Sequence, residues 1–163
     1  MVRYSRRHAF LAAMAAVLAL TACSVRRMAV DTMGDALASG GGVFASDDDP
    51  DLIRDAVPFG LKTYESLLAE SPEHRGLLLA AASGFIRYAR AFVQEDADRV
   101  DADDAAAARG LRARARRLYL RGRDYALRGL EASYPGFGER YRTDRAGALA
   151  DTEADDAPFL YWA

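Results

Sequence analysis

Residues 49–92 read DPDLIRDAVPFGLKTYESLLAESPEHRGLLLAAASGFIRYARAF, and this stretch decides the fold. Its apolar residues recur at steps of three and four on each side of Ser71-Pro72, which places them on one face of a 3.6-residue helix. Asp49 followed by Pro50 is a favourable helix opening, because the aspartate side chain caps free amides and proline sits where no donor is needed. The stretch therefore predicts two amphipathic helices joined by a short turn.

The segments that follow predict further helices. The second helix of the hairpin would cover residues 73–93, and a third long helix covers residues 104–133 and ends at Tyr134-Pro135-Gly136. A weaker helix covers residues 137–150, and one more begins at Phe159. We therefore predict an all-α fold of antiparallel helix pairs.

Two segments interrupt these patterns. Pro58 lies inside the first helix, and because the apolar face continues in phase through it, we expect one kinked helix there. Residues 94–104 carry six acidic side chains, and we interpret them as a solvated loop, or as the end of one helix followed by the cap of the next.

A further regularity lies within the hairpin. Gly60, Tyr64, Leu67 and Pro72 have the spacing of a small residue, an aromatic, an apolar residue and a proline, which looks like the second helix of a tetratricopeptide repeat. The small residue would let a neighbouring helix approach, and the proline would end the helix. We expect a tetratricopeptide-like α-solenoid that is incomplete at the C-terminus, since a solenoid needs about three repeats to bury its faces.

Composition excludes several classes of function. The 163 residues suit one domain, and 22 basic against 24 acidic residues give no general attraction to nucleic acid. Eight arginines lie between Arg109 and Arg128, but they scatter around the outer arc of the third helix without interleaved exposed aromatics. We interpret them as a solvated face and expect no nucleic-acid partner.

The sequence also carries no recognisable catalytic motif. His74 is the only histidine after residue 23, and neither a nucleophile-elbow serine nor an HExxH motif is present. We predict no catalytic residue, no metal site and no cofactor. An envelope hydrolase that works through paired carboxylates remains the weakest alternative.

The N-terminus predicts export. Arg3, Arg6 and Arg7 precede an apolar run from Ala9 to Leu20, which is too short to span a membrane but suits a secretory signal. The run ends in Leu20-Thr21-Ala22-Cys23, which looks like a bacterial lipobox. We expect residues 1–22 to be a lipoprotein signal peptide and Cys23 to carry lipid; the alternative is a signal sequence cut elsewhere.

The lipobox implies an arrangement of three parts. After the signal peptide, residues 23–48 would form an anchor helix with a linker around Gly40-Gly41-Gly42, and residues 49–163 would form the helical domain. Lipid chains on Cys23 would anchor the protein on the periplasmic face of the cell envelope. Ser24 in place of aspartate favours the outer membrane.

Taken together, these blocks resemble the T-component (TatT) family associated with TRAP transporters. The residues that carry the resemblance, besides the lipobox, run in the same order through most of the chain: Ala36–Gly41, Asp47–Pro50, Pro58–Lys62, Glu65–Pro72, Leu77–Ala81, Gly84-Phe85, Tyr88-Ala89, Ala91–Val93, Arg117–Leu127 and Leu160–Ala163. The resemblance implies an all-helical lipoprotein that assembles as a trimer, pairs with the periplasmic substrate-binding (P) subunit, and helps to deliver a small organic ligand. Members of this family usually continue beyond the Leu-Tyr-Trp block, so we expect a C-terminal truncation.

Five aromatic residues are the candidates for lining a ligand or partner groove. They lie at helical spacing on the apolar faces: Tyr64, Phe85, Tyr88, Tyr119 and Tyr125. Each has the alternative role of an ordinary core side chain. The alternatives to an accessory transport component are a non-functional remnant and a structural envelope lipoprotein.

Overall fold

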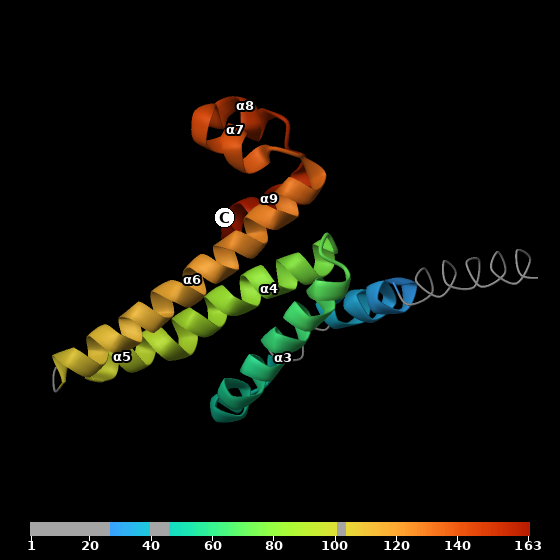
Figure 1. Cartoon of the computed structure of the whole chain (residues 1–163). Coiled ribbons are helices and arrows are strands. Elements are labelled where there is room, and N and C mark those ends of the chain that lie inside the picture. The colour runs from blue at the N-terminus through green and yellow to red at the C-terminus, as the bar shows by residue number, and fades with distance from the viewer. Residues whose placement is uncertain (1–26, 40–45, 101–103) are drawn as a thin grey trace, which may run out of the picture.

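The computed structural model describes residues 27–39, 46–100 and 104–163, and within these ranges the chain forms helices and turns without a strand (Figure 1). Residues 27–39 are helical. The elements that follow are α3 (Pro50–Glu70), α4 (Arg75–Tyr88), the π-helix η1 (Ala89–Gln94), α5 (Glu95–Val100), α6 (Ala105–Ser133), α7 (Phe137–Thr143), α8 (Arg145–Ala150), the 3₁₀ turn η2 (Ala154–Asp156) and α9 (Ala157–Trp162). The predicted all-helical class is confirmed.

Helix α3 begins where the sequence predicts. The Asp49 carboxylate accepts hydrogen bonds from the amides of Asp51 and Leu52 at 3.1 and 3.0 Å, which satisfies two of the free donors of the first turn. Pro58 lies inside this helix, which continues to Glu70 as one element. The extended backbone of Ser71 then ends it.

Most of the acidic segment, residues 94–104, is helical. Helical structure continues through η1 and α5 to Val100, so the loop interpretation is wrong for residues 94–100. Arg54 holds Asp96 at 2.6 Å and Arg112 holds Asp98 at 3.3 Å, so carboxylates that would repel one another are paired across elements. The alternative of a new cap is confirmed, because Asp104 accepts from two amides of the first turn of α6.

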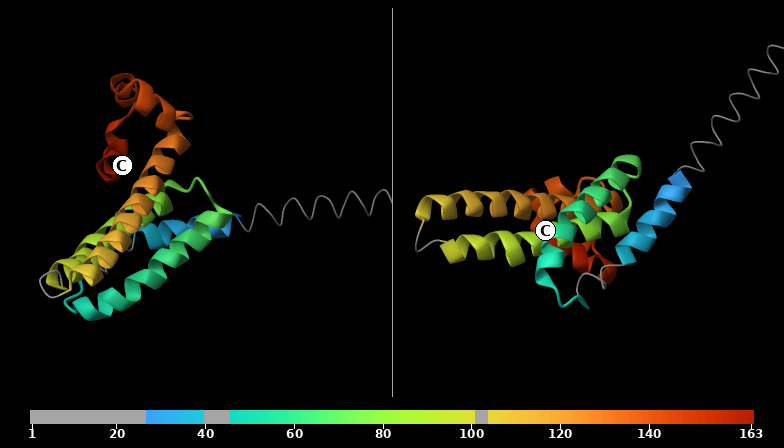
Figure 2. Two further views of the ribbon diagram at one scale, coloured as in Figure 1. Left: turned by 60° about the vertical axis from the view of Figure 1, so that its left-hand side comes forward. Right: turned by 90° about the horizontal axis from the view of Figure 1, so that it is seen from below.

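Helix α4 is central to the fold. It contacts α3 on one side and α6 on another, and Figures 1 and 2 show α6 lying alongside α4, η1 and α5. Arg75–Val100 form 26 helical residues that contain an 18-residue window with a mean hydropathy of 1.3, so by length and composition alone this helix could cross a membrane. The helix lies between two other helices, and a core helix in such a position has the same apolar composition.

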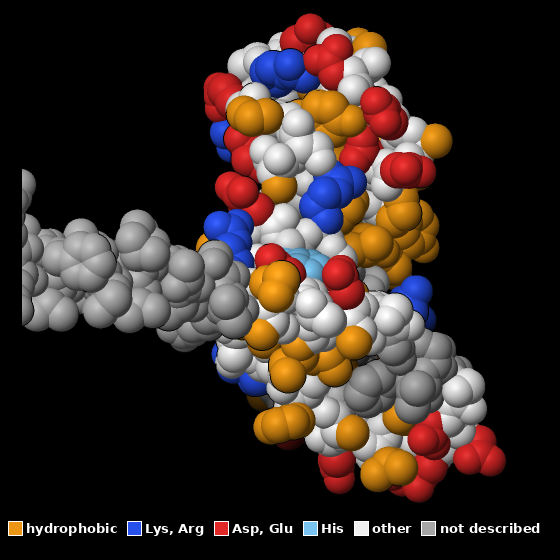
Figure 3. Space-filling view, turned by 90° about the vertical axis from the view of Figure 1, so that its right-hand side faces the viewer, with side chains coloured by type: hydrophobic (Ala, Val, Ile, Leu, Met, Phe, Trp, Pro, Cys, Tyr) orange, Lys and Arg blue, Asp and Glu red, His pale blue; other side chains and the backbone are white. Residues whose placement is uncertain are grey.

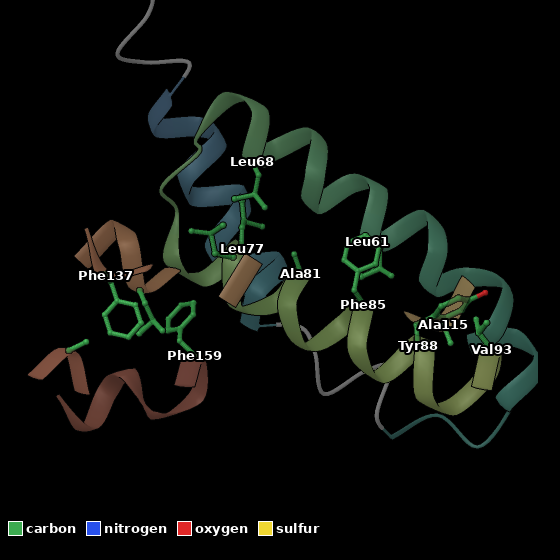
Figure 4. Close-up of a cluster of buried hydrophobic side chains, with 13 residues drawn as sticks. Leu61, Leu68, Leu77, Ala81, Phe85, Tyr88, Val93, Ala115, Phe137 and Phe159 are labelled. Atoms are coloured by element: carbon green, nitrogen blue, oxygen red, sulfur yellow. The ribbon is translucent and has the colours of Figure 1, made fainter. Parts of the chain in front are cut away.

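The core fills the space around α4. Figure 4 shows Leu61 and Phe85 side by side between α3 and α4, with Leu77 and Ala81 nearer to the α3–α4 turn. Small residues bring α6 close: a Cβ at Gly122 would lie 2.5 Å from the Ile86 side chain. The large side chains that are almost completely buried are Leu77, Leu78, Val93, Leu130 and Phe137.

The C-terminal part folds back onto the long helices (Figure 2). The single weak helix expected over residues 137–150 is two helices, because Asp144 ends α7 and its side chain accepts from the Gly147 amide at 3.0 Å to begin α8. Helix α9 then packs on α6 and α4 with Phe159 buried and Tyr161 exposed.

Candidate functional site

An apolar groove of about 280 Å³ lies between α3 and α4. One wall comes from α3, the opposite wall from α4 and η1, and Ala38 of the N-terminal helical residues contributes at the edge. The lining residues are Ala38, Ile53, Val57, Gly60, Leu61, Tyr64, Ala80, Ser83, Gly84, Arg87, Tyr88, Ala91 and Phe92. Most are apolar or small, so the groove is a hollow that a hydrophobic group can enter.

Two of the five predicted aromatics line this groove. Tyr64 lies on the α3 wall, where burial raises the pKa of its hydroxyl above the ordinary value, and that hydroxyl reaches the Leu37 carbonyl at 3.5 Å. Tyr88 lies at the end of α4, largely buried, with its ring 5.3 Å from that of Phe92. Both rings could contact a bound molecule directly.

The other three aromatics lie at contacts with α6. The Phe85 ring stacks on the Tyr125 ring at 5.8 Å, and the Tyr125 hydroxyl donates to Glu65 at 2.6 Å. Tyr119 donates to the Gln94 side chain at 2.6 Å. Of the five residues, Tyr64 and Tyr88 line the groove and the other three do not. A role of any of the five in binding stays a prediction.

Glu65 is the centre of the polar contacts between α3 and α6. Its carboxylate accepts from Lys62 and from Tyr125, each at 2.6 Å, and pairs with Arg121 of α6. Burial alone would raise the pKa of Glu65, but these donors outweigh it and hold the pKa below its ordinary value. Burial, followed by the bond to Glu65, raises the pKa of Tyr125. This cluster is satisfied internally and holds the helices together.

Most residues that line the groove are not among the five predicted aromatics. Ala80, Ser83, Gly84, Arg87 and Ala91 follow one another at helical spacing along the α4 and η1 wall. The run of small residues at 80–84 was the available signal. The π-helical segment adjoins it, a rare conformation that often occurs at functional sites.

Arg87 is the only charged residue among the described residues that line the groove. Its guanidinium lies 5.4 Å from the centre of the Trp162 ring of α9. It has no carboxylate partner within the described ranges, unlike Arg54 and Arg90 nearby, which pair with Asp96 and Glu95. The groove thus combines apolar walls with one positive charge.

Hydrophobic side chains also gather on the outer surface of α3 and of residues 27–39. Figure 3 shows them over α3 and residues 27–39, whereas acidic and basic side chains lie over α7 and α8 above. Phe59 is 79% exposed, and Leu52, Met28 and Met33 are more than half exposed. Exposed apolar side chains that gather in this way are typical of a surface that contacts another molecule.

A second, polar hollow surrounds His74 at the start of α4. The His74 ring accepts from the Leu77 amide through Nδ1 at 3.2 Å, and Nε2 lies 3.1 Å from the Asp31 carbonyl. Ser71 donates to the Asp31 carboxylate at 2.6 Å. These bonds join residues 27–39 to the α3–α4 turn. Within the described ranges no group of three or more His, Cys, Asp or Glu side chains could hold a metal ion.

The predicted signal peptide and Cys23 lie outside the described residues. Lipidation at Cys23 and the boundaries of the three expected parts therefore stay predictions.

Comparison with known proteins identifies a relative and a family. A relative from Treponema pallidum (strain Nichols), named "Uncharacterized protein", is 36% identical over 170 aligned residues, which cover 92% of this chain and 52% of the relative. This chain therefore spans about half the length of the relative. Residues 46–163, which hold all the elements from α3 to α9 and almost all of the groove, match the family described as TRAP transporter T-component. The chain belongs to the TRAP transporter T-component family.

Proposed function

We propose that this chain is a lipid-anchored accessory component of a TRAP-type transporter, which docks the periplasmic substrate-binding subunit and holds a small organic ligand in the α3–α4 groove. The observation that carries the proposal is the family match over residues 46–163. The match is to a component of a transporter, and it supports a non-catalytic role in the cell envelope.

Within this proposal the helices form tetratricopeptide-like antiparallel pairs. The short α3–α4 turn and the position of α6 alongside α4 support such pairing. Gly60 and Tyr64 line the groove, as a repeat that presents its small and aromatic residues to a binding surface would have them. Assembly as a trimer and anchoring in the outer membrane through Cys23 belong to the same proposal.

The exposed apolar surface of α3 is where we place the docking of the substrate-binding subunit. Phe59 lies in the sequence between the groove-lining residues Val57 and Gly60, but it is on the outer side of the helix and is 79% exposed. Large aromatic side chains of this kind are common anchors of protein interfaces. Docking there would place the subunit on the outer side of α3, whose opposite side lines the groove.

A flotation experiment tests the docking. The full chain is reconstituted in phospholipid vesicles and mixed with the purified substrate-binding subunit of the same transporter, and we expect the subunit to float with the vesicles. Phe59→Ala should abolish most of the co-flotation without loss of helical content, because the ring makes little contact within the chain. Leu149→Ala on α8, another exposed apolar side chain, is the matched control and should bind normally.

The outcomes separate the alternatives. Co-flotation that Phe59→Ala does not weaken would place the docking surface elsewhere on the chain. A subunit that never floats with wild-type vesicles would contradict the proposed partner and favour a structural envelope lipoprotein or a remnant without activity.

A further inference from the structure

We propose that the α3–α4 groove is selective for an amphipathic organic anion, whose apolar chain lies along the groove walls and whose single carboxylate pairs with Arg87. This inference rests on the proposed ligand-binding role of the groove and names the chemical class of the ligand.

The walls specify the apolar part of the ligand. On the α3 side the groove is lined by the branched aliphatic side chains of Ile53 and Val57. On the α4 side Ala80 and Gly84 have a small side chain or none, so they leave space above the helix backbone. A volume of about 280 Å³ lies near the lower limit of roughly 300 Å³ for ligand pockets. A short unbranched hydrocarbon chain suits such a hollow better than a bulky ring system.

The charge of the groove specifies the polar part. No aspartate or glutamate occurs among the lining residues, so an anion that approaches Arg87 meets no opposing carboxylate within the groove. A guanidinium presents parallel N–H donors that match the two oxygens of a carboxylate. Arg87 is itself exposed, so the specificity of this pairing comes from the two parallel hydrogen bonds.

Arg87 lies midway along the α4 and η1 wall of the groove, between Ala80 and Phe92, and its guanidinium is held by a neighbouring ring. The indole ring of Trp162 lies beneath it at 5.4 Å, a distance at which a cation and an aromatic face attract each other. Ser83 lies one helical turn earlier on the same face and also lines the groove, and its hydroxyl makes only a long bond of 3.3 Å to the Ala80 carbonyl. That hydroxyl is placed to donate a second hydrogen bond to the same carboxylate.

The test compares hexanoate with 1-hexanol, two probes with the same chain length and different charge. The full chain is reconstituted in phosphatidylcholine vesicles, and binding is measured by calorimetry and by the fluorescence of Trp162, which is the only tryptophan of the chain. Empty vesicles correct for partition of the probes into lipid. The variants are Arg87→Gln, Ser83→Leu and, as matched control, Arg116→Gln, an exposed arginine on α6 outside the groove.

We expect hexanoate to bind the wild-type chain roughly tenfold more tightly than 1-hexanol, because a hydrogen bond to a charged group contributes more than a neutral one. Arg87→Gln should weaken hexanoate roughly tenfold and leave 1-hexanol unchanged. Ser83→Leu, which fills the groove, should weaken both probes, and Arg116→Gln should change neither.

Two results would overturn the inference in different ways. If both probes bind equally and Arg87→Gln affects neither, the groove takes a ligand without regard to charge, and the proposed ligand-binding role stands without the anion. If neither probe binds the wild-type chain, the ligand part of the proposed function fails as well, while the docking of the substrate-binding subunit is decided separately by flotation.

Discussion

The Phe159 ring of α9 lies directly against the backbone of Gly129 in α6: a Cβ added at Gly129 would come within 2.0 Å of Phe159 Cε1. The absence of a side chain at Gly129 lets α9 approach α6 closely enough to bury Phe159 to 2% exposure. Arg75 covers the other side of the ring, with its guanidinium 4.6 Å from the ring centre. This contact joins the C-terminal helix to both α4 and α6.

Gly129→Ala should therefore destabilise the protein. A methyl group at this position must displace the Phe159 ring, and overpacking of this kind costs about 1–3 kcal/mol. That cost exceeds the gain of about 1 kcal/mol from replacing a helical glycine with alanine. We expect a melting temperature several degrees lower, measured by circular dichroism.

Gly110→Ala is the matched control for this change, because it lies in the same helix with nothing within 4 Å of the added Cβ. It should raise stability by about 0.5–1 kcal/mol. Equal effects of the two alanines would show that the Phe159 contact does not form as described.

Asp156 should make the stability of the C-terminal part depend on acid. Burial would raise the pKa of its carboxyl group, but bonds from the Tyr134 hydroxyl at 2.5 Å, from the Glu153 amide and from Arg75 hold the pKa below its ordinary value of 3.8. Because the pKa is lower in the folded state, the ionised carboxylate contributes its full stabilisation above pH 3.8. This contribution is lost as the pH falls from 3.8 through the pKa of the folded state.

Thermal unfolding at several pH values measures this contribution. Asp156→Asn should lower the melting temperature near pH 7, and the difference from wild type should shrink as the pH falls below 3.8. Asp155→Asn, at an exposed position next to it, should show little difference at any pH. A difference for Asp156→Asn that stays constant down to pH 2 would contradict the stabilising role of the ionised carboxylate.

The bond between Tyr125 and Glu65 should couple α6 to α3. A double-mutant cycle with Tyr125→Phe and Glu65→Ala, measured by urea unfolding, should give a coupling energy of about 1.5 kcal/mol, because each single variant removes the hydrogen bond to the charged acceptor. Tyr161→Phe is the control: its ring is 75% exposed, so the loss of its hydroxyl should change stability by less than about 0.5 kcal/mol. Additive effects of the two changes would mean that the two side chains do not interact.

Cys23 should carry the lipid anchor. Cells that express the full chain and are fed labelled palmitate should incorporate the label into the wild-type protein, and Cys23→Ser should abolish this and release the chain from the membrane fraction. Ser24→Ala, at the next position, should keep both the label and the membrane location. Label that persists in Cys23→Ser would disprove the lipobox interpretation.

Local signals predicted most of the helices. Asp49 and Asp104 each cap the helix that follows, and Gly136 adopts a positive φ of 82° in the turn that the Tyr-Pro-Gly sequence predicts. The continuation of the second helix through Asp96 and Asp98 could not be predicted in this way. The partners of these carboxylates, such as Arg54 in α3, are distant in sequence, and helical periodicity carries no information about them.

The candidate site could be predicted only in part for a related reason. Periodicity places Phe85 and Tyr88 on the apolar surface of α4, but this central helix has two covered sides, and spacing does not tell which neighbour covers which side. Phe85 meets Tyr125 of α6, whereas Tyr88 lines the groove beside α3. The sequence carries no signal for Arg87 either, because its position at the groove depends on packing between α3, α4 and α9.

His74 should link the start of α4 to residues 27–39 through two separable bonds. Its Nδ1 caps the Leu77 amide, and its Nε2 donates to the Asp31 carbonyl in the neutral tautomer that this cap requires. Asparagine can cap a helix but is too short to reach Asp31, whereas alanine can do neither. His74→Ala should therefore cost about 1 kcal/mol more global stability than His74→Asn, measured by urea unfolding.

Both variants should speed hydrogen exchange of the amides in residues 27–39 to the same extent, because both lose the bond to Asp31. If exchange there stays slow in both, the bond from Ser71 to the Asp31 carboxylate holds these residues without help from His74.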